Sequence, residues 1–151
     1  SVVLLSDIDQ RALSLAHENI QRCAPNGRVH CIMADLLTPL APKSIDLILA
    51  NPPYVSTIEM HQLPPEYRYE PYGALQADEK GVALAVELLR DATRVLSDSG
   101  LLILEVGESV EALERRLPKV PFTWIDLPDG AAGVAAVSAQ ELRDWSAAGD
   151  L

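Results

Sequence analysis

The sequence predicts an α/β fold, with a mainly parallel sheet, helices on its faces and an antiparallel hairpin at its carboxyl end. Short apolar segments alternate with segments of helical periodicity, which is typical of a parallel sheet with crossover helices. The apolar segments are nearly continuous, as expected for strands that are covered on both faces. Two final strand-like segments flank a turn at Asp129-Gly130, which predicts the hairpin. The 151 residues suffice for one domain with a sizeable core.

The first third of the chain holds three predicted strands and one predicted helix. The strands are expected at residues 2–6, 29–34 and 45–50, and the helix at residues 9–24. Asp9 is a suitable N-cap for that helix, because its side-chain oxygen can accept a hydrogen bond from a free backbone N–H. The apolar face of the helix is predicted to comprise Ala12, Leu13, Ala16, Ile20 and Cys23.

A long proline-rich segment, residues 52–78, follows the third strand and contains all 4 tyrosines of the chain. Segments of this length inside a domain are usually functional or disordered. Disordered segments are poor in aromatic residues, so we expect an ordered loop that covers a substrate.

The remaining elements alternate between helix and strand. A helix is predicted at residues 80–97 and a short charged helix at residues 110–117. A fourth strand is expected at residues 101–106, and the hairpin strands at residues 122–127 and 134–138. No internal repeat or low-complexity segment is visible, so the pattern indicates one α/β unit.

Composition narrows the classes of partner. The net charge of −10, without a basic patch, disfavours nucleic acid as a direct partner. An acidic surface favours a cationic ligand or a basic protein, although solubility alone explains it equally well. No apolar run is long enough to cross a bilayer and no signal peptide is visible, so we expect a cytoplasmic protein without a membrane partner.

The cysteines and histidines do not have the spacing of metal ligands. Cys23 and Cys31 form no Cys-x-x-Cys pair and lie in apolar patterns, which predicts buried thiols. His17, His30 and His61 show no ligand spacing with each other or with cysteine. We therefore expect no metal.

Polar side chains follow the predicted strands, at the edge where open α/β sheets bind their ligands. Asp7, Asp35 and Asn51 come directly after the first three strands, and Glu105 lies near the end of the fourth. An acid that follows a strand and precedes a helix can accept hydrogen bonds from both hydroxyls of a ribose, which assigns this role to Asp7. Asp9, two residues later, is instead the expected helix cap.

The second strand end suggests contacts with a base. Asp35 can accept a hydrogen bond from an adenine amino group, and Leu36 can pack against the adenine ring. Together with Asp7, these residues predict a site for an adenosine-containing cofactor.

The stretch Asn51-Pro52-Pro53-Tyr54 at the end of the third strand is the most specific motif of the chain. Proline fixes its own φ and restricts the preceding residue to extended conformations, so the backbone here is stiff. The Asn51 side-chain oxygen and the Pro52 carbonyl can then accept hydrogen bonds from one planar –NH2 group stacked on Tyr54. A simple strand-to-loop exit is the alternative, because Asn-Pro pairs are common in turns.

The spacing of Asp7, Asp35 and Asn51 resembles that of class I S-adenosylmethionine-dependent methyltransferases, which have a Rossmann-like sheet. Residues 51–54 resemble the signature of the enzymes that methylate a planar nitrogen. Residues 63–71 and 120–124 are similar to the protein-glutamine N5-methyltransferase family, closest to the branch that acts on ribosomal protein L3. The sister branch methylates the Gly-Gly-Gln motif of peptide-chain release factors.

The resemblance implies the roles of the site residues. Asn51 and the Pro52 carbonyl hold the two N–H groups of the substrate amide, and Pro53 and Tyr54 complete the catalytic and substrate-binding stretch. Asn51 also contributes to the cofactor site. Glu70 is implied to contact the substrate, and both Glu70 and Glu105 are candidate proton acceptors that are more often structural.

The chain departs from the family pattern in its glycines. These enzymes have a glycine-rich loop after their first strand, whereas no Gly-x-Gly occurs here. Aligned on the motifs, residues 2–6 correspond to the second strand of the family. The first strand, its loop and the substrate-recognising amino-terminal region are then absent, and the missing strand is central, between those ending in Asp7 and Asn51. We therefore expect residues 1–151 to be the carboxyl-terminal part of one catalytic domain, with weak or no binding of S-adenosylmethionine.

Three alternatives to methylation of L3 remain open. Within the same family, a release factor is the second choice of substrate. The nearest rival enzyme is a nucleic-acid amino-methyltransferase, which resembles this chain at residues 51–54. The absent glycine loop also suits a non-catalytic remnant that acts as a binding module. Methyl transfer to L3, to a release factor and to DNA separates these possibilities.

Overall fold

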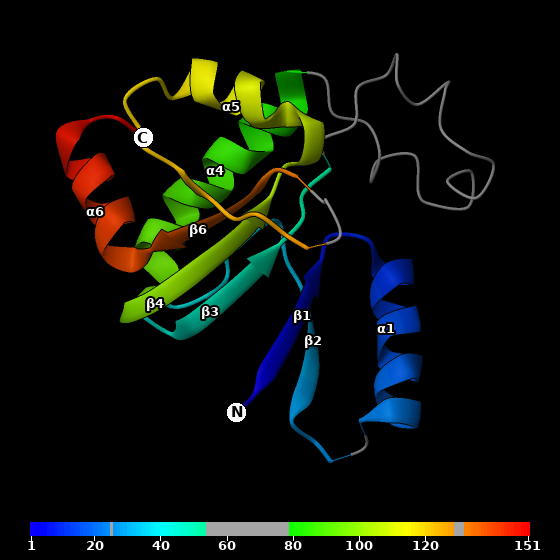
Figure 1. The fold of residues 1–151 in the computed structure, drawn as a ribbon. Helices are drawn as coiled ribbons and strands as arrows, with labels where there is room; N and C mark the ends of the chain where they lie inside the picture. The colour runs from blue at the N-terminus through cyan, green and yellow to red at the C-terminus, as the bar shows by residue number, and fades with distance from the viewer. Residues whose placement is uncertain (25, 54–78, 129–131) are drawn as a thin grey trace. The chain divides into compact units, whose positions relative to one another are not determined.

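The computed structural model describes residues 1–24, 26–53, 79–128 and 132–151. Its internal contacts divide the chain into two compact units, Ser1–Leu40 and Ala41–Leu151, which we call unit 1 and unit 2. Figure 1 shows the elements of both units.

Unit 1 consists of a parallel pair of strands and one helix. Strand β1 (Val3–Asp7) pairs with β2 (Val29–Met33), and helix α1 (Gln10–Cys23) connects them (Figure 1). The predicted strands and helix are thus confirmed to within a residue or two at their ends. Two side chains of α1, Leu13 and Ile20, are buried.

Two predictions about burial in unit 1 are wrong. All five residues of β1 are exposed, because β1 is bonded only to β2 among the described strands and unit 1 contains one described helix. The cysteines are not both buried, since Cys23 is exposed and Cys31 is half-buried. Cys23 is the last residue of α1 and lies beyond Ile20, the last buried residue of the helix.

Unit 2 is a four-stranded mixed sheet with helices. Its strands run in the order β3-β4-β6-β5, in which β3 and β4 are parallel and β6 is antiparallel to both β4 and β5. The predicted hairpin pairing of the last two strands is therefore confirmed, although the turn at Asp129-Gly130 lies outside the described residues. The elements are β3 (Ile45–Ala50), α4 (Glu79–Val95), β4 (Leu96–Glu105), η2 (Gly107–Ser109), α5 (Val110–Arg116), β5 (Thr123–Trp124), β6 (Val134–Ser138) and α6 (Ala139–Ala148).

One face of the unit 2 sheet is buried, and the other face is exposed at β3 and at Leu101 of β4. Leu102 and Leu104 of β4 are fully buried, whereas Leu101, on the opposite face, is 36% exposed. Leu101 pairs with Leu47 of β3, which is 52% exposed, and Leu49 is 73% exposed. The prediction that the strands are covered on both faces is therefore wrong for β3 as well. Helices α4 and α6 pack against each other and against β4 on the covered face.

The boundary between α4 and β4 differs from the prediction. A helix was expected to continue to residue 97, but Leu96 is the first residue of β4. Two backbone interactions explain the change, since Leu96 pairs with Ile45 and its carbonyl accepts a hydrogen bond from Arg143 Nη2 at 2.8 Å. Both partners are distant in sequence, so helical periodicity alone misplaced the boundary.

Helix α6 was not predicted, although the sequence carries a signal for its start. The Ser138 hydroxyl accepts a hydrogen bond from the Glu141 N–H, and the Glu141 carboxylate accepts one from the Ser138 N–H at 2.8 Å. This reciprocal pair is a capping box, which the pattern Ser-x-x-Glu indicates. The helix ends at Gly149, whose φ of 75° is favourable for glycine.

No described helix is long and apolar enough to span a membrane.

Candidate functional site

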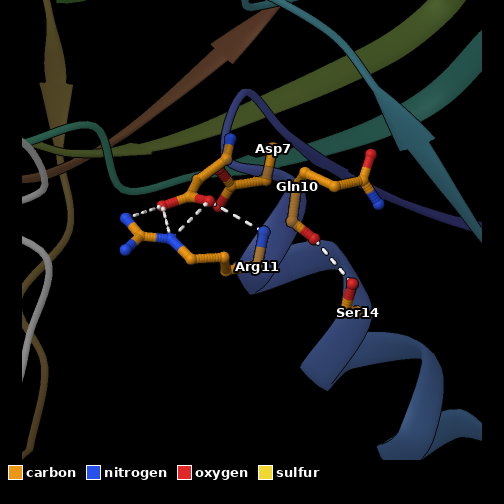
Figure 2. A network of polar contacts seen from close by, with 5 residues as sticks. Asp7, Gln10, Arg11 and Ser14 are labelled. Carbon is orange, nitrogen blue, oxygen red and sulfur yellow. Dashed lines mark hydrogen bonds and ion pairs between the residues drawn. The ribbon is translucent and has the colours of Figure 1, made fainter.

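Asp7 stands at the carboxyl end of β1, with its side chain held in a defined turn. Its Oδ1 accepts a hydrogen bond from the Asp9 backbone N–H at 2.7 Å, and Figure 2 shows this turn entering α1. A short Asp side chain that binds the backbone two residues later fixes the chain direction at the turn. A carboxylate has about four lone-pair positions, so one backbone hydrogen bond leaves Asp7 the capacity to bind hydroxyl groups.

Asp9 has a different role, as the sequence indicated. It is the N-cap of α1 and accepts a hydrogen bond from the Arg11 backbone N–H at 2.7 Å. Its second oxygen forms an ion pair with Arg11 Nη2 at 2.8 Å. The hydrogen bond from the Arg11 guanidinium lowers the pKa of Asp9 below its ordinary value. Asp9 is therefore engaged in capping, which leaves Asp7 as the candidate ligand-binding acid.

The loop after β2 continues the ladder of unit 1 and then turns. The Ala34 N–H donates to the Asp7 carbonyl at 3.0 Å, and the Thr38 hydroxyl donates to the Asp35 carbonyl at 2.7 Å. Ala34 and Leu37 are buried, at 7% and 8% exposure, while Asp35 between them is exposed. The loop is thus anchored on both sides of Asp35 and presents its carboxylate to solvent.

Leu36 adopts an unusual backbone conformation. Its φ is 49°, in the left-handed region, where a side chain with a Cβ costs about 1–2 kcal/mol. Its carbonyl accepts a hydrogen bond from the Ser6 hydroxyl at 3.4 Å, and its side chain is half-buried. Such outliers occur in tight turns and at functional sites, and here one lies beside a candidate cofactor residue.

A second group of candidate residues lies in unit 2, at the carboxyl ends of its parallel strands β3 and β4. Asn51 follows β3 and is exposed, while Pro52 is buried and Pro53 is half-buried. Glu105 is the last residue of β4 and is half-buried. Because Ala50 pairs with Leu104 in parallel strands, Asn51 and Glu105 leave neighbouring strands at the same edge of the sheet.

The structure therefore groups the predicted residues in two sets, one in each unit. The pairing of Asp7 with Met33 places Asp7, Asp35 and Leu36 at one end of unit 1. Tyr54 and Glu70 lie outside the described residues. Within the described ranges, no three His, Cys, Asp or Glu side chains gather in a way that could hold a metal ion.

Sequence reasoning overlooked Ser6 and Gly133. Ser6 contacts a residue 30 positions away, so only the pairing of β1 with β2 reveals it. Gly133, at φ 76°, lies so close to the Gly107 backbone that a Cβ would overlap it. The Gly133 carbonyl also accepts a hydrogen bond from the Val106 N–H at 2.8 Å, directly after β4. Neither contact leaves a local pattern in the sequence.

Comparison with known proteins supports the family resemblance. The family model described as methyltransferase small domain matches residues 1–63. The chain is 45% identical over 141 residues to the ribosomal protein uL3 glutamine methyltransferase of Xanthomonas campestris pv. campestris. It is 39% identical over 140 residues to the protein of the same name from Francisella tularensis subsp. tularensis. Each match covers 93% of this chain but only 46% and 45% of the relative, so the chain spans about half the length of these relatives.

Solved structures show the fold. The catalytic domain of hMettl16, in complex with a 3′UTR hairpin, aligns with a TM-score of 0.61 at 16% identity, over 91% of this chain and 55% of that chain. A methyltransferase from Geobacter sulfurreducens aligns with a TM-score of 0.50 at 14% identity, over 90% of this chain and 56% of that chain. The predicted fold class is confirmed: the chain has the class I methyltransferase fold.

Proposed function

We propose that the full-length protein containing this chain transfers a methyl group from S-adenosylmethionine to the N5 nitrogen of a glutamine in ribosomal protein uL3. The supporting observation is the identity of 39% and 45% to two proteins of that name, over 93% of this chain. The Asn51-Pro52-Pro53-Tyr54 stretch supports the same chemistry, because it supplies two acceptors for one –NH2 group. Ribosomal proteins are made in the cytoplasm, so we place the reaction there.

The described residues of unit 1 fit the adenosine part of the cofactor. In our proposal, Asp7 accepts hydrogen bonds from the ribose hydroxyls, because a carboxylate that accepts the Asp9 N–H has further lone pairs. Asp35, exposed in an anchored loop, accepts from the adenine amino group, and the half-buried Leu36 packs against the ring. When bound, the cofactor supplies the electrophilic methyl group.

Methylation of the substrate amide depends on how the amide is positioned. An amide nitrogen is a poor nucleophile, because its lone pair is delocalised into the carbonyl. Asn51 and the Pro52 carbonyl orient the amide by accepting its N–H groups, and Tyr54 restricts its plane. These acceptors also stabilise the positive charge that develops on the nitrogen during methyl transfer. The buried Pro52 ring anchors the motif while Asn51 remains accessible. In our proposal Asn51 is also a candidate contact for the cofactor, Pro53 stiffens the motif, and Glu70 and Glu105 are candidate acceptors for the released proton.

We also propose that the chain is the carboxyl-terminal part of its catalytic domain. Among the described strands, β1 pairs only with β2, and β3 pairs only with β4, so each has a free edge. Both strands expose apolar side chains, including Val3 at 47% and Leu49 at 73%. Parallel strands are normally covered on both faces, so these exposed residues suit contacts with further segments of the full-length protein.

Methyl transfer by the full-length protein tests the function. Labelled S-adenosylmethionine should methylate uL3 in preference to a release factor or DNA. Asn51→Ala should reduce kcat by about 10²–10³-fold, as expected for the loss of one aligned polar group in a transition state. Asn26→Ala is the matched control, because Asn26 is an exposed asparagine outside the proposed site, and its side chain accepts a hydrogen bond from the Arg28 N–H. Equal or greater transfer to a release factor or DNA would contradict the proposed substrate.

Cofactor binding by the isolated chain tests the proposal that the chain is only part of its catalytic domain. Calorimetric titration of residues 1–151 with S-adenosylmethionine should show weak or no binding, whereas the full-length protein should bind. Micromolar affinity of the isolated chain would show that the residues outside it are not required. Absence of methyl transfer by the full-length protein would favour the alternative of a non-catalytic binding module.

A further inference from the structure

We propose that Ser6 is a positioning residue for the cofactor, acting through the backbone of Leu36. The inference rests on the proposed function, in which Leu36 packs against the adenine ring. It assigns a role to the serine hydroxyl, which does not itself contact the cofactor in this arrangement.

The contact joins two segments that are far apart in the sequence. Ser6 belongs to β1, where it pairs with Ile32, and its hydroxyl donates to the Leu36 carbonyl at 3.4 Å in the loop after β2. One residue later in β1, the Asp7 carbonyl accepts from the Ala34 N–H at 3.0 Å. The end of β1 therefore holds the loop at two points, one on each side of Asp35.

Leu36 requires such support because of its backbone conformation. Its φ of 49° is unfavourable for leucine, so the residue would relax toward the extended or right-handed region if the contacts that hold it were weakened. The backbone conformation alone does not favour leucine at this position, because glycine or asparagine adopts a positive φ more readily. A leucine kept there suggests that its side chain is needed at that place.

Relaxation of Leu36 should remain local. Ala34 and Leu37 on either side are buried, at 7% and 8% exposure, and the Thr38 hydroxyl still donates to the Asp35 carbonyl. Loss of the Ser6 hydroxyl should thus turn the Leu36 side chain without unfolding the loop. The expected consequence is weaker cofactor binding at nearly unchanged stability.

The test compares three variants of the full-length protein. Ser6→Ala removes the hydroxyl, and Ser6→Thr retains a hydroxyl on a residue well suited to a strand. Ser14→Ala is the control, because the Ser14 hydroxyl donates to the Gln10 carbonyl within α1 at 2.8 Å (Figure 2). Affinity for S-adenosylhomocysteine is measured by calorimetry, and kcat and both KM values are measured with uL3.

We expect Ser6→Ala to raise the Kd of S-adenosylhomocysteine and the KM for S-adenosylmethionine roughly two- to tenfold, the range for loss of one hydrogen bond. The kcat and the KM for uL3 should stay unchanged, because neither depends on the affinity for the cofactor in this proposal. The thermal midpoint should stay nearly unchanged, because relaxation of Leu36 remains local. Ser6→Thr should restore the affinity, and Ser14→Ala should match the unmodified protein.

Equal affinities of the unmodified protein and Ser6→Ala would overturn the inference and leave the proposed function intact. A parallel fall in kcat and thermal midpoint would also overturn it, because it would indicate a purely structural role. If Ser6→Ala does not fold, Leu36→Ala provides the test, since an unchanged cofactor affinity in that variant would remove the basis of the inference. Absence of cofactor binding by the unmodified protein would overturn both the inference and the proposed function.

Discussion

The two units of the chain differ sharply in how well they are packed. In unit 1 the buried apolar residues Leu13, Ile20, Ala34 and Leu37 retain between 6% and 9% exposure. In unit 2 several core leucines, among them Leu89, Leu102 and Leu142, have 0% exposure. A unit of about forty residues rarely buries enough apolar surface to be stable alone. The comparison indicates that unit 2 has a core of its own, whereas unit 1 depends more on contacts from other segments.

The two units, which differ in packing, also carry different parts of the proposed site. The loosely packed unit carries Asp7, Asp35 and Leu36, the proposed adenosine-binding residues, and the well-packed unit carries Asn51 and Pro52. Binding sites are frequently less stable than the cores that support them. Ligand binding to the native state then raises stability by mass action, and in this protein that gain should appear mainly in unit 1.

The largest difference between the units is expected from truncation of their core leucines. Leu102→Ala should lower the free energy of unfolding by about 2–5 kcal/mol, because a fully buried side chain leaves a cavity. Leu13→Ala should cost less, since Leu13 retains 6% exposure in a small core that can collapse. Denaturant titration measures both changes, and hydrogen exchange should be faster in β1 than in β4. An equal or larger cost for Leu13→Ala would contradict the comparison.

A pair of glycines in unit 2 sharpens the comparison at the level of the backbone. Gly133→Ala should destabilise by about 2–4 kcal/mol, because the new Cβ would overlap the Gly107 backbone at a φ of 76°. Gly149→Ala is the control, since Gly149 has a similar φ of 75° but no atom within 4 Å of the added Cβ. Gly149→Ala should cost only about 1–2 kcal/mol, the strain alone. Equal thermal midpoints of the two variants would show that the close approach to Gly107 is unimportant.

Substitutions at the N-caps of α6 and α1, which are Ser138 and Asp9, should have smaller effects on stability. Ser138→Ala should cost about 1 kcal/mol, because it removes one half of the capping box with Glu141. Ser138→Asn should retain most of the stability, as asparagine is a good N-cap. Asp9→Asn is the corresponding change in unit 1 and should likewise preserve its cap. Circular dichroism during thermal unfolding measures these shifts, and an equal loss for Ser138→Ala and Ser138→Asn would contradict a capping role.

The smallest effects are expected from the exposed ion pairs. A hydrogen bond from Lys43 lowers the pKa of Asp98 below its ordinary value of 3.8, with a further contribution from Arg143. The contribution of Asp98 to stability is therefore complete above that ordinary value and is lost as pH falls through the lowered pKa. Asp9 in unit 1 behaves in the same way through Arg11.

Asp98→Asn should thus lower the thermal midpoint slightly at pH 7 and leave it unchanged at strongly acidic pH. High salt should weaken the effect, because exposed charges are screened. A larger effect of Asp98→Asn in acid than at neutral pH would contradict the assigned direction.

Elements with strong local signals were predictable from the sequence. The bounds of β3 agree to the residue, and α1 starts after its predicted cap Asp9. Helix α6 was equally predictable from Ser138 and Glu141, although the pattern was overlooked. The boundary at Leu96 was not predictable, because it depends on Ile45 and Arg143, which are distant in the chain.

The sequence by itself determined the alternation of strands and helices, the residues at the strand ends and the resemblance to glutamine methyltransferases. These features are local, arising from periodicity, capping and short motifs. Tertiary structure alone decided that β1 and one face of β3 are exposed, that Leu36 has a left-handed backbone, and that Ser6 and Gly133 make close contacts. The physical reason is that exposure and close approach depend on which strands pair, and strand pairing joins residues far apart in the sequence.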